Sequence, residues 1–130
     1  MVLFCIGINV ILIKMKYGIV GSRRRIDRHN VLSFIKSLKN DDIVISGGCR
    51  GIDTWAEEIA KSLGIKTIIY KPDLKNIKSK GDMIQRYYDR NKKIAQACDV
   101  LIAFVSSDRK GGTENTIKYA TELGKIVEVK

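Results

Sequence analysis

Five short apolar runs alternate with four longer segments along the chain, and the two classes differ in how their apolar residues are spaced. The runs are nearly continuous in apolar residues, which is typical of strands that are buried on both faces of a parallel sheet. They occupy residues 17–20, 43–46, 66–70, 100–105 and 126–129. The longer segments carry apolar residues at helical spacing and predict helices over residues 27–38, 53–63, 82–97 and 113–123.

This alternation predicts an α/β fold in which helices connect parallel strands. Because such crossovers are right-handed, the expected architecture is a Rossmann-like, doubly wound parallel five-stranded sheet. Numbered along the chain, its strands are expected in the order 3-2-1-4-5. Asp27 and Thr113 are expected to cap their helices. Asn40 suits a left-handed helix end, and Gly64 and Gly124 are expected to stop the helices before them.

Residues 1–14 are an apolar N-terminal extension, which we separate from a single Rossmann-like domain over residues 15–130. Met15 begins the stretch MKYGIVGSR, a natural start for such a domain, so an upstream start of the reading frame would account for the extension. Its apolar run is too short to cross a membrane, which takes about 20 residues, and it lacks the marks of a signal peptide. We expect it to form an additional β-segment or to cover an apolar patch.

The composition indicates one globular domain with a large positive charge. The chain has 130 residues, of which 45% are hydrophobic, and 24 Lys and Arg against 14 Asp and Glu give a net charge of +10. Its three cysteines, Cys5, Cys49 and Cys98, are widely spaced, and His29 is the only histidine. We therefore expect no metal site, no disulfide framework, no membrane association and a cytoplasmic location.

Glycine-containing turns follow the three strands that meet where the predicted strand order reverses. These turns are Gly21-Ser22-Arg23, Gly47-Gly48-Cys49-Arg50-Gly51 and Lys110-Gly111-Gly112-Thr113. Ligands in such sheets bind outside the carboxyl ends of the strands, at the point of reversal. The N–H groups at the start of the following helices favour anions. The pattern therefore predicts one ligand site shared by the three turns.

Basic side chains accompany all three turns. They are Arg23, Arg24, Arg25, Arg50, Arg109 and Lys110. Because a guanidinium group binds phosphate oxygens with paired hydrogen bonds, the expected ligand is a phosphorylated small molecule, most simply a nucleotide. For any single turn, the alternative is that glycine closes a tight connection and the arginines are solvated. No GxGxxG or GxxxxGK[ST] motif is present, so a dinucleotide fingerprint and a P-loop are excluded, and no separate cofactor is expected.

Four stretches, taken in order, resemble the SLOG superfamily. They are GIVGSR at residues 18–23, VISGGCRGIDTWAEEIAKSLG at 44–64, YYDRNKKIAQACDVLIAF at 87–104 and GGTENTIKYATELGK at 111–125. The superfamily unites the DNA-processing protein A family, the Lonely Guy phosphoribohydrolases (often mislabelled lysine decarboxylases), molybdenum-cofactor carriers and small YspA-like proteins, whose turns are the most similar. The resemblance implies a Rossmann-like fold that binds a nucleotide or nucleotide-derived ligand as a sensor or carrier. It also suggests dimers formed through helices beside the site.

The resemblance assigns residues to this site. They are Gly21, Ser22 and Arg23 in the first turn, Gly47, Gly48, Gly51 and Asp53 in the second, Arg90 and Asn91 in the long helix, and Gly111, Gly112 and Thr113 in the last turn. We add Arg50 from its place in the second turn. Thr116 stands where the phosphoribohydrolases carry a glutamate. Because cleavage of an N-glycosidic bond needs a carboxylate to position water, enzymatic activity stays open, with a nucleoside-monophosphate phosphoribohydrolase as the alternative to a binding protein.

For several side chains the sequence allows both a ligand-binding role and a structural role. Asp53 can cap its helix, contact a ribose hydroxyl, or do both. Trp55, Tyr87 and Tyr88 can stack on a base or belong to the core or an interface. Glu57, like its neighbour in sequence, is expected to be solvated.

Binding of single-stranded nucleic acid is a further alternative. The net charge of +10 and the four lysines within residues 71–80 favour polyanions. Stacking aromatic residues do not interleave with these lysines, so we rank this alternative below a nucleotide pocket.

Overall fold

The computed structural model describes residues 2–6 and 9–130, with side chains from residue 14 onward. Its centre is a parallel five-stranded sheet made of β3 (Lys16–Gly21), β4 (Ile43–Ser46), β5 (Lys66–Ile69), β6 (Val100–Phe104) and β7 (Ile126–Val129). The strands lie in the order β5-β4-β3-β6-β7. The predicted α/β, doubly wound architecture and the order 3-2-1-4-5 are therefore confirmed.

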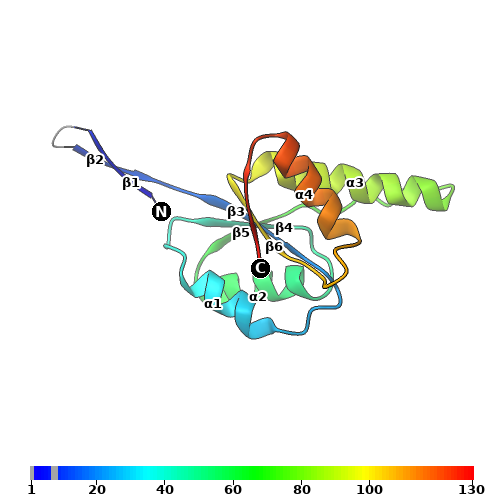
Figure 1. Ribbon diagram of the computed structural model, residues 1–130, viewed down its shortest axis with the longest axis horizontal. Helices are drawn as coiled ribbons and strands as arrows, with labels where there is room; N and C mark the ends of the chain where they lie inside the picture. Colours follow the sequence, from blue (N-terminus) through cyan, green and yellow to red (C-terminus); the bar gives the residue numbers. More distant parts are fainter. Residues whose placement is uncertain (1, 7–8) are drawn as a thin grey trace.

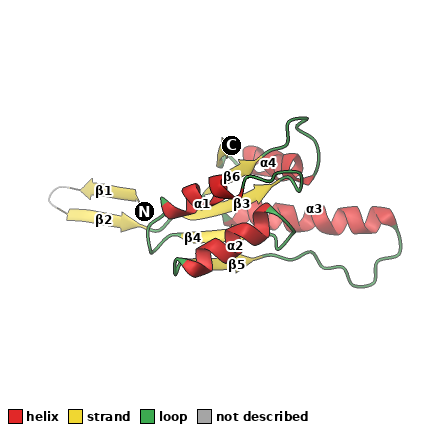
Figure 2. Ribbon diagram, turned by 90° about the horizontal axis from the view of Figure 1, so that it is seen from below, coloured by secondary structure: helices red, strands yellow, loops and turns green. Residues whose placement is uncertain are grey.

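Two helices cover each face of this sheet (Figure 1 and Figure 2). They are α1 (Arg28–Lys36) and α2 (Ile52–Ser62) on one face, and α3 (Lys80–Ala97) and α4 (Gly112–Glu122) on the other. Successive residues of one strand enter different cores: Ile102 packs on the α1–α2 side, and Leu101 packs on the α3–α4 side. Because both faces are covered, β6 is buried along its whole length, which accounts for the continuous apolar runs.

The ends of α1 differ from the sequence prediction. Asp27 occupies the N-cap position, but its carboxylate bonds to Arg25 and not to a helix N–H. The helix ends at Lys36, and Asn40 is not left-handed, so that expectation was wrong. A turn follows instead, in which the Asp42 N–H donates to the Lys39 carbonyl at 3.0 Å and the Asp42 carboxylate accepts the Lys39 N–H at 3.0 Å.

The other helix ends are set by small residues. The hydroxyl of Ser79 caps α3 by accepting the Asp82 N–H at 3.1 Å, so the helix begins two residues before the predicted start at residue 82. Gly111, not Thr113, precedes α4, so Thr113 lies inside the helix. Glycines follow α2 and α4 with φ values of 73°, so both predicted helix stops are confirmed.

The N-terminal extension forms a separate antiparallel hairpin. Its strands are β1 (Val2–Ile6) and β2 (Asn9–Ile13), which pair with each other outside the five-stranded sheet. The hairpin and the first turns of α3 project from opposite ends of the molecule (Figure 1 and Figure 2). Residues 1, 7 and 8 of the predicted extension, and its side chains up to residue 13, lie outside the described part. In the remainder, no helix has the length and apolar character needed to span a membrane.

The strand order creates a crevice at the carboxyl ends of the central strands β3 and β6. β3 and β6 pair from Tyr17 opposite Val100 to Gly21 opposite Phe104 at their carboxyl ends. The chain leaves β3 toward α1 on one face and leaves β6 toward α4 on the other. Because the two connections diverge, they leave room between them, which is where ligands bind in sheets of this kind.

Candidate functional site

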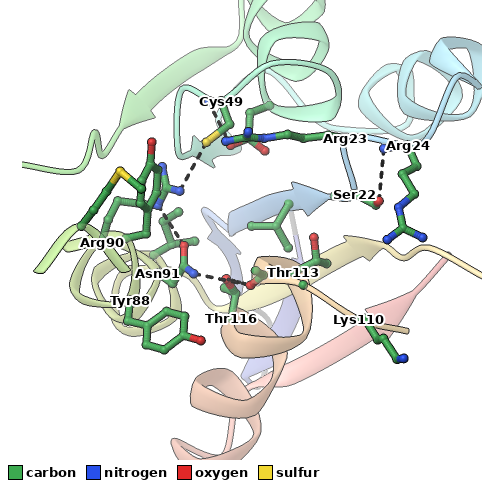
Figure 3. Close-up of a pocket in the computed structure, with 18 residues that line it drawn as sticks. Ser22, Arg23, Arg24, Cys49, Tyr88, Arg90, Asn91, Lys110, Thr113 and Thr116 are labelled. Carbon is green, nitrogen blue, oxygen red and sulfur yellow. Dashed lines mark hydrogen bonds between the residues drawn. The ribbon is translucent and has the colours of Figure 1, made fainter. Parts of the chain in front are cut away.

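A cleft of about 460 Å³ lies over the carboxyl ends of β3 and β6. Its walls come from the loop after β3, the helix α3, and the loop that leads from β6 into α4 (Figure 3). The lining residues are Val20, Gly21, Ser22, Arg23, Arg24, Cys49, Asp53, Met83, Tyr87, Tyr88, Arg90, Asn91, Ile94, Lys110, Gly111, Gly112, Thr113 and Thr116. Segments that are distant in sequence thus share one cleft at the reversal of strand order.

Nine of the thirteen residues predicted for the site line this cleft. They are Gly21, Ser22, Arg23, Asp53, Arg90, Asn91, Gly111, Gly112 and Thr113. The other four, Gly47, Gly48, Arg50 and Gly51, lie in the turn after β4 and do not line it. In that turn, Cys49 reaches the cleft instead.

The turn after β3 is held close to its neighbours. A Cβ atom on Gly21 would lie 2.3 Å from Cγ1 of Ile52, so the absence of a side chain lets α2 pack against the end of the strand. The Ser22 N–H donates to the Phe104 carbonyl at 2.9 Å and ties the turn to β6. The Ser22 hydroxyl accepts the Arg24 N–H at 3.2 Å. These contacts fix the backbone at the floor of the cleft and leave the following side chains exposed.

Arg90 holds the turn after β4 from the opposite wall. Its side chain is buried, and it donates to the Gly47 carbonyl at 2.6 Å, to Oδ1 of Asn91 at 2.9 Å and to Sγ of Cys49 at 3.3 Å. A Cβ atom on Gly47 would lie 2.5 Å from Nη1 of Arg90. Gly47 is therefore required by the approach of this guanidinium group, and Arg90 contributes to the site mainly by fixing the turn.

Asp53, at the start of α2, also holds the turn after β4. Its carboxylate is buried and accepts the Cys49 N–H at 3.2 Å. Burial raises the pKa of Asp53 to about 6, and hydrogen bonds from the turn and the positive charge of Arg90 oppose this rise. Asp53 therefore holds the turn and does not cap α2, which has no side-chain cap at Gly51. It is also the carboxyl group of the cleft lining.

The start of α4 forms a polar floor beside the cations. Thr113 and Thr116 are both buried, and the Thr116 hydroxyl donates to the Gly112 carbonyl at 3.2 Å. Nδ2 of Asn91 donates to Oδ1 of Asn115 at 3.0 Å, which joins α3 to α4. Backbone N–H groups in the first turn of a helix have no partners within the helix and favour anions. This end of the cleft is therefore suited to a phosphate or a carboxylate.

Cations flank this floor on the two loops. Arg24 pairs with Asp108 at 2.6 Å, Arg109 pairs with Glu114 at 2.9 Å, and Arg25 turns away to pair with Asp27. Among the described residues, no carboxylate lies within ion-pair distance of Arg23 or Lys110. Figure 3 shows Arg24 and Lys110 on the same side of the cleft, with Thr113 between them and α3.

The opposite end of the cleft is apolar and aromatic. Met83, Tyr87, Tyr88 and Ile94 of α3 line it, and the Arg90 guanidinium lies 5.5 Å from the centre of the Tyr87 ring. Figure 3 places Tyr88 and Arg90 across the cleft from Arg24 and Lys110. Trp55 packs into the α1–α2 core and has no place in the cleft. The cleft therefore joins a cationic end to an aromatic end.

The sequence prediction missed several lining residues. Met83 is one of them, and it lies four residues before Tyr87, which is a candidate for base stacking, a spacing that could have indicated their shared face. Cys49 gave no signal, because its contact with Arg90 depends on the fold. Glu57 is half-buried, not solvated as expected, because its Oε1 accepts the Ser46 hydroxyl at 2.7 Å.

Metal ligands do not gather in the described part of the chain. No group of three His, Cys, Asp or Glu residues in that part could hold a metal ion. Cys49 and Cys98 are both free thiols. The chemistry available in the cleft is therefore that of its cations, hydroxyls, amides, aromatic rings and the single Asp53 carboxyl group.

Two solved structures share this fold. DNA processing protein A (DprA) from Streptococcus pneumoniae is similar with a TM-score of 0.73 and 24% identity, over 89% of this chain and 50% of that one. This chain thus spans about half the length of that protein. The C-terminal domain of a hydrogenase from Pyrococcus furiosus is similar with a TM-score of 0.52 and 15% identity, over 89% of this chain and 91% of that one. No curated protein sequence matches the chain.

The family is shown by sequence as well as by fold. A family model described as DNA recombination-mediator protein A matches residues 1–80, which is 80 of the 130 residues. The match includes the turns after β3 and β4, two of the stretches on which the resemblance to the SLOG superfamily depends. The chain therefore belongs to the family of DNA recombination-mediator protein A, within the SLOG superfamily.

Proposed function

We propose that the protein binds a nucleotide or a nucleotide-derived phosphorylated ligand in this cleft, as a sensor or carrier. Membership of the family supports a role connected with nucleotides or nucleic acids. The observation that carries the finer proposal is the division of the cleft into a cationic end and an aromatic end. A nucleotide has the same division, with a phosphate at one end and a planar base at the other.

The cationic end suits the phosphate. Lys110 has no carboxylate partner among the described residues, and the first turn of α4 supplies backbone N–H groups. Arg23 adds a positive charge from across the cleft, where its guanidinium lies beside Cys49 and Tyr87. Charge-assisted hydrogen bonds to a phosphate are about twice as strong as neutral ones. In the proposed complex, the phosphate lies over Thr113, between the loop after β3 and the loop before α4.

The aromatic end suits the base. Tyr87 and Tyr88 offer ring faces, and base–aromatic stacking contributes about 1–3 kcal/mol per base. Asp53 lines the cleft with a carboxyl group that can accept a hydrogen bond from a ribose hydroxyl. We place Asp53 as the ribose contact, in addition to its structural bond to the Cys49 N–H.

Hydrolysis is the second candidate function. Asp53, whose pKa is raised to about 6, has the titration range of a proton donor or acceptor near neutral pH. Thr116, at the position of the phosphoribohydrolase glutamate, is buried and bonded within its own helix. Because the lining supplies one carboxyl group and not the expected second one, we rank a nucleoside-monophosphate phosphoribohydrolase below a binding protein.

Single-stranded nucleic acid is the other candidate ligand. The loop from β5 to α3 and the start of α3 expose Lys71, Lys75, Lys78 and Lys80. These side chains would follow a phosphate backbone, and such binding would weaken steeply with salt. Binding of a mononucleotide at moderate salt, without binding of a strand, favours the pocket.

We extend the proposal to a homodimer in the cytoplasm, with the domain at residues 15–130 as its ligand-binding unit. At the mouth of the cleft, α3 exposes Met83 by 38%, Ile84 by 41% and Tyr88 by 39%, and Met83 and Tyr88 also line the cleft. Apolar residues exposed together on one helix favour burial against a second copy. Light scattering of the purified protein tests the dimer, because a monomeric mass at micromolar concentration would reject it.

A thermal-shift screen tests the central proposal. The panel is nucleoside mono-, di- and triphosphates, NAD and ADP-ribose. A ligand present at 100 times its Kd stabilises the folded state by about 2.7 kcal/mol, which raises the Tm by several degrees. Each ligand that binds is then incubated with the protein, and released base or phosphate is measured. The proposal is rejected if no member of the panel raises the Tm.

A further inference from the structure

One ion pair joins the two loops at the cationic end of the cleft. Nη1 of Arg24, after β3, lies 2.6 Å from Oδ2 of Asp108, after β6. The other oxygen of Asp108 accepts the Ser106 hydroxyl at 2.7 Å and the Lys110 N–H at 3.3 Å. Arg24 and Lys110 line the cleft, and the carboxylate of Asp108 bonds to the Arg24 side chain and to the Lys110 N–H. A carboxylate is therefore fixed among the cations that a phosphate would contact.

This carboxylate changes the charge that a ligand meets. Asp108 neutralises Arg24, and Glu114 neutralises Arg109, so these two pairs contribute no net charge. The charges of Arg90 and Asp53, which also line the cleft, offset each other. Lys110, and Arg23 beside Cys49 and Tyr87, then leave two formal positive charges in the cleft. A phosphomonoester carries two negative charges near neutral pH, whereas di- and triphosphates carry more. The local charge thus matches one terminal phosphate.

The position of Asp108 affects how the cleft accommodates a second or third phosphate of a ligand. With the base at α3 and the first phosphate over Thr113, further phosphates continue away from α3. Figure 3 shows Arg24 and Lys110 on that side of the cleft. Asp108 does not line the cleft, but it is bonded to Arg24 and to the backbone of Lys110, which do, so a second phosphate that approached these cations would meet its carboxylate. Placing like charges together is an effective way to disfavour a competing ligand.

We infer that Asp108 is a specificity-determining residue that makes the cleft select a single terminal phosphate over a di- or triphosphate. Its carboxylate holds Arg24 in place of a second phosphate, and a longer phosphate chain has to displace it. This inference rests on the proposed function, because it concerns the selectivity of the same cleft.

The test compares the phosphate series on three variants. Kd values of AMP, ADP and ATP, and of GMP, GDP and GTP, are measured by calorimetry for the wild type, Asp108→Asn and Asp108→Glu. The wild type is expected to bind the monophosphate most tightly. Asp108→Asn keeps an oxygen acceptor for the loop but removes the charge, so the ratio of triphosphate Kd to monophosphate Kd should fall about three- to tenfold. Asp108→Glu should keep that ratio within about twofold.

Asp41→Asn is the matched control. Asp41 is exposed just before β4, at the amino ends of the strands and away from the cleft, and its substitution removes the same formal charge. An equal change of the ratio in Asp41→Asn and Asp108→Asn would overturn the inference, as would a wild type that prefers triphosphates. If no nucleotide binds to the wild type, the proposed function fails and the inference falls with it. If nucleotides bind without regard to Asp108, the proposed function stands and the inference alone is rejected.

Discussion

The two walls of the cleft hold their cations in different ways. Arg90, on the α3 wall, is buried and donates to Gly47, Cys49 and Asn91. Arg23 and Lys110, on the loop wall, are exposed, and no carboxylate of the described chain pairs with them. A buried guanidinium group with three bonds to the protein is part of the scaffold. Arg23 also contacts the Cys49 thiol and the Tyr87 hydroxyl, but it is exposed, and Lys110 is exposed without a carboxylate partner, so both are available to a ligand. Proximity to a cleft therefore does not by itself make a cation a ligand contact.

The same distinction applies to the glycines. Gly47 is needed because Arg90 and Asp53 crowd its α-carbon, and Gly21 is needed because Ile52 packs against it. Both glycines make room for protein atoms and not for a ligand. In this chain the glycine pattern marks where the scaffold is tight, and the tight scaffold in turn places the cleft.

The largest expected effect comes from removing the scaffold cation. Arg90→Ala leaves the Gly47 carbonyl without its donor and the buried charge of Asp53 without its nearest cation. Breaking a buried charged network of this kind costs about 3–5 kcal/mol of the free energy of unfolding, which urea denaturation measures.

Arg86→Ala is the control for this change. Arg86 lies one turn earlier on α3, is partly exposed, pairs with Asp73 at 3.4 Å and donates to the Asp73 carbonyl at 3.0 Å. An exposed ion pair contributes about 0.2–1 kcal/mol, so the loss should be small. Equal losses for the two variants would contradict the division between the walls. A folded Arg90→Ala protein with unchanged nucleotide affinity would remove Arg90 from the site.

The sequence was sufficient to predict the sheet and most of the lining, because both follow from local patterns. Continuous apolar runs gave all five strands, and the strand order placed the turns after β3 and β6 side by side. It could not show that Arg50 points away while Cys49 faces the cleft. That difference depends on Arg90, which is distant in sequence and reaches the turn only in the folded protein. The direction of a side chain in a turn is set by such long-range contacts.

A smaller effect on folding stability is expected from pH, through the Asp53 carboxyl group that holds the turn after β4. The folded-state pKa of Asp53 is about 6, above its usual value of 3.8, because burial penalises its charge. The stabilisation from this group is therefore fully present below about pH 4 and lost as the pH rises through about 6. Asp53→Asn has no charge to bury and can still accept the Cys49 N–H. It should exceed the wild type in stability by about 2–3 kcal/mol at pH 8, and by much less at pH 4.

Thermal unfolding of both proteins from pH 4 to pH 8 measures this difference. Other carboxyl groups titrate equally in the two proteins, so their contributions cancel in the comparison. If the two proteins show the same dependence of stability on pH, the Asp53 charge carries no penalty in the folded state. Arg90 on the α3 wall would then not be needed to offset that charge.

The loop wall predicts a loss of affinity without a loss of stability. Lys110→Gln removes one exposed cation from the cleft, and the expected result is an affinity about tenfold lower for the nucleotide, or about 1.4 kcal/mol. Lys118→Gln, at an exposed position of α4 outside the lining, should leave the affinity unchanged. The Tm without ligand should stay the same in both variants. A Tm decrease in Lys110→Gln alone would place this lysine in the scaffold with Arg90.

The smallest effect is expected from the hairpin. β1 and β2 pair only with each other in the described sheets, and β2 leads into the amino end of β3, whereas the cleft lies at its carboxyl end. A protein that begins at Met15 keeps the five strands, the four helices and both walls of the cleft. Its nucleotide affinity should equal that of the full chain within about twofold, since no lining residue precedes Val20. A tenfold loss in calorimetry would mean that the hairpin acts on the cleft through β3, and the two walls could then no longer be treated as a self-contained pair.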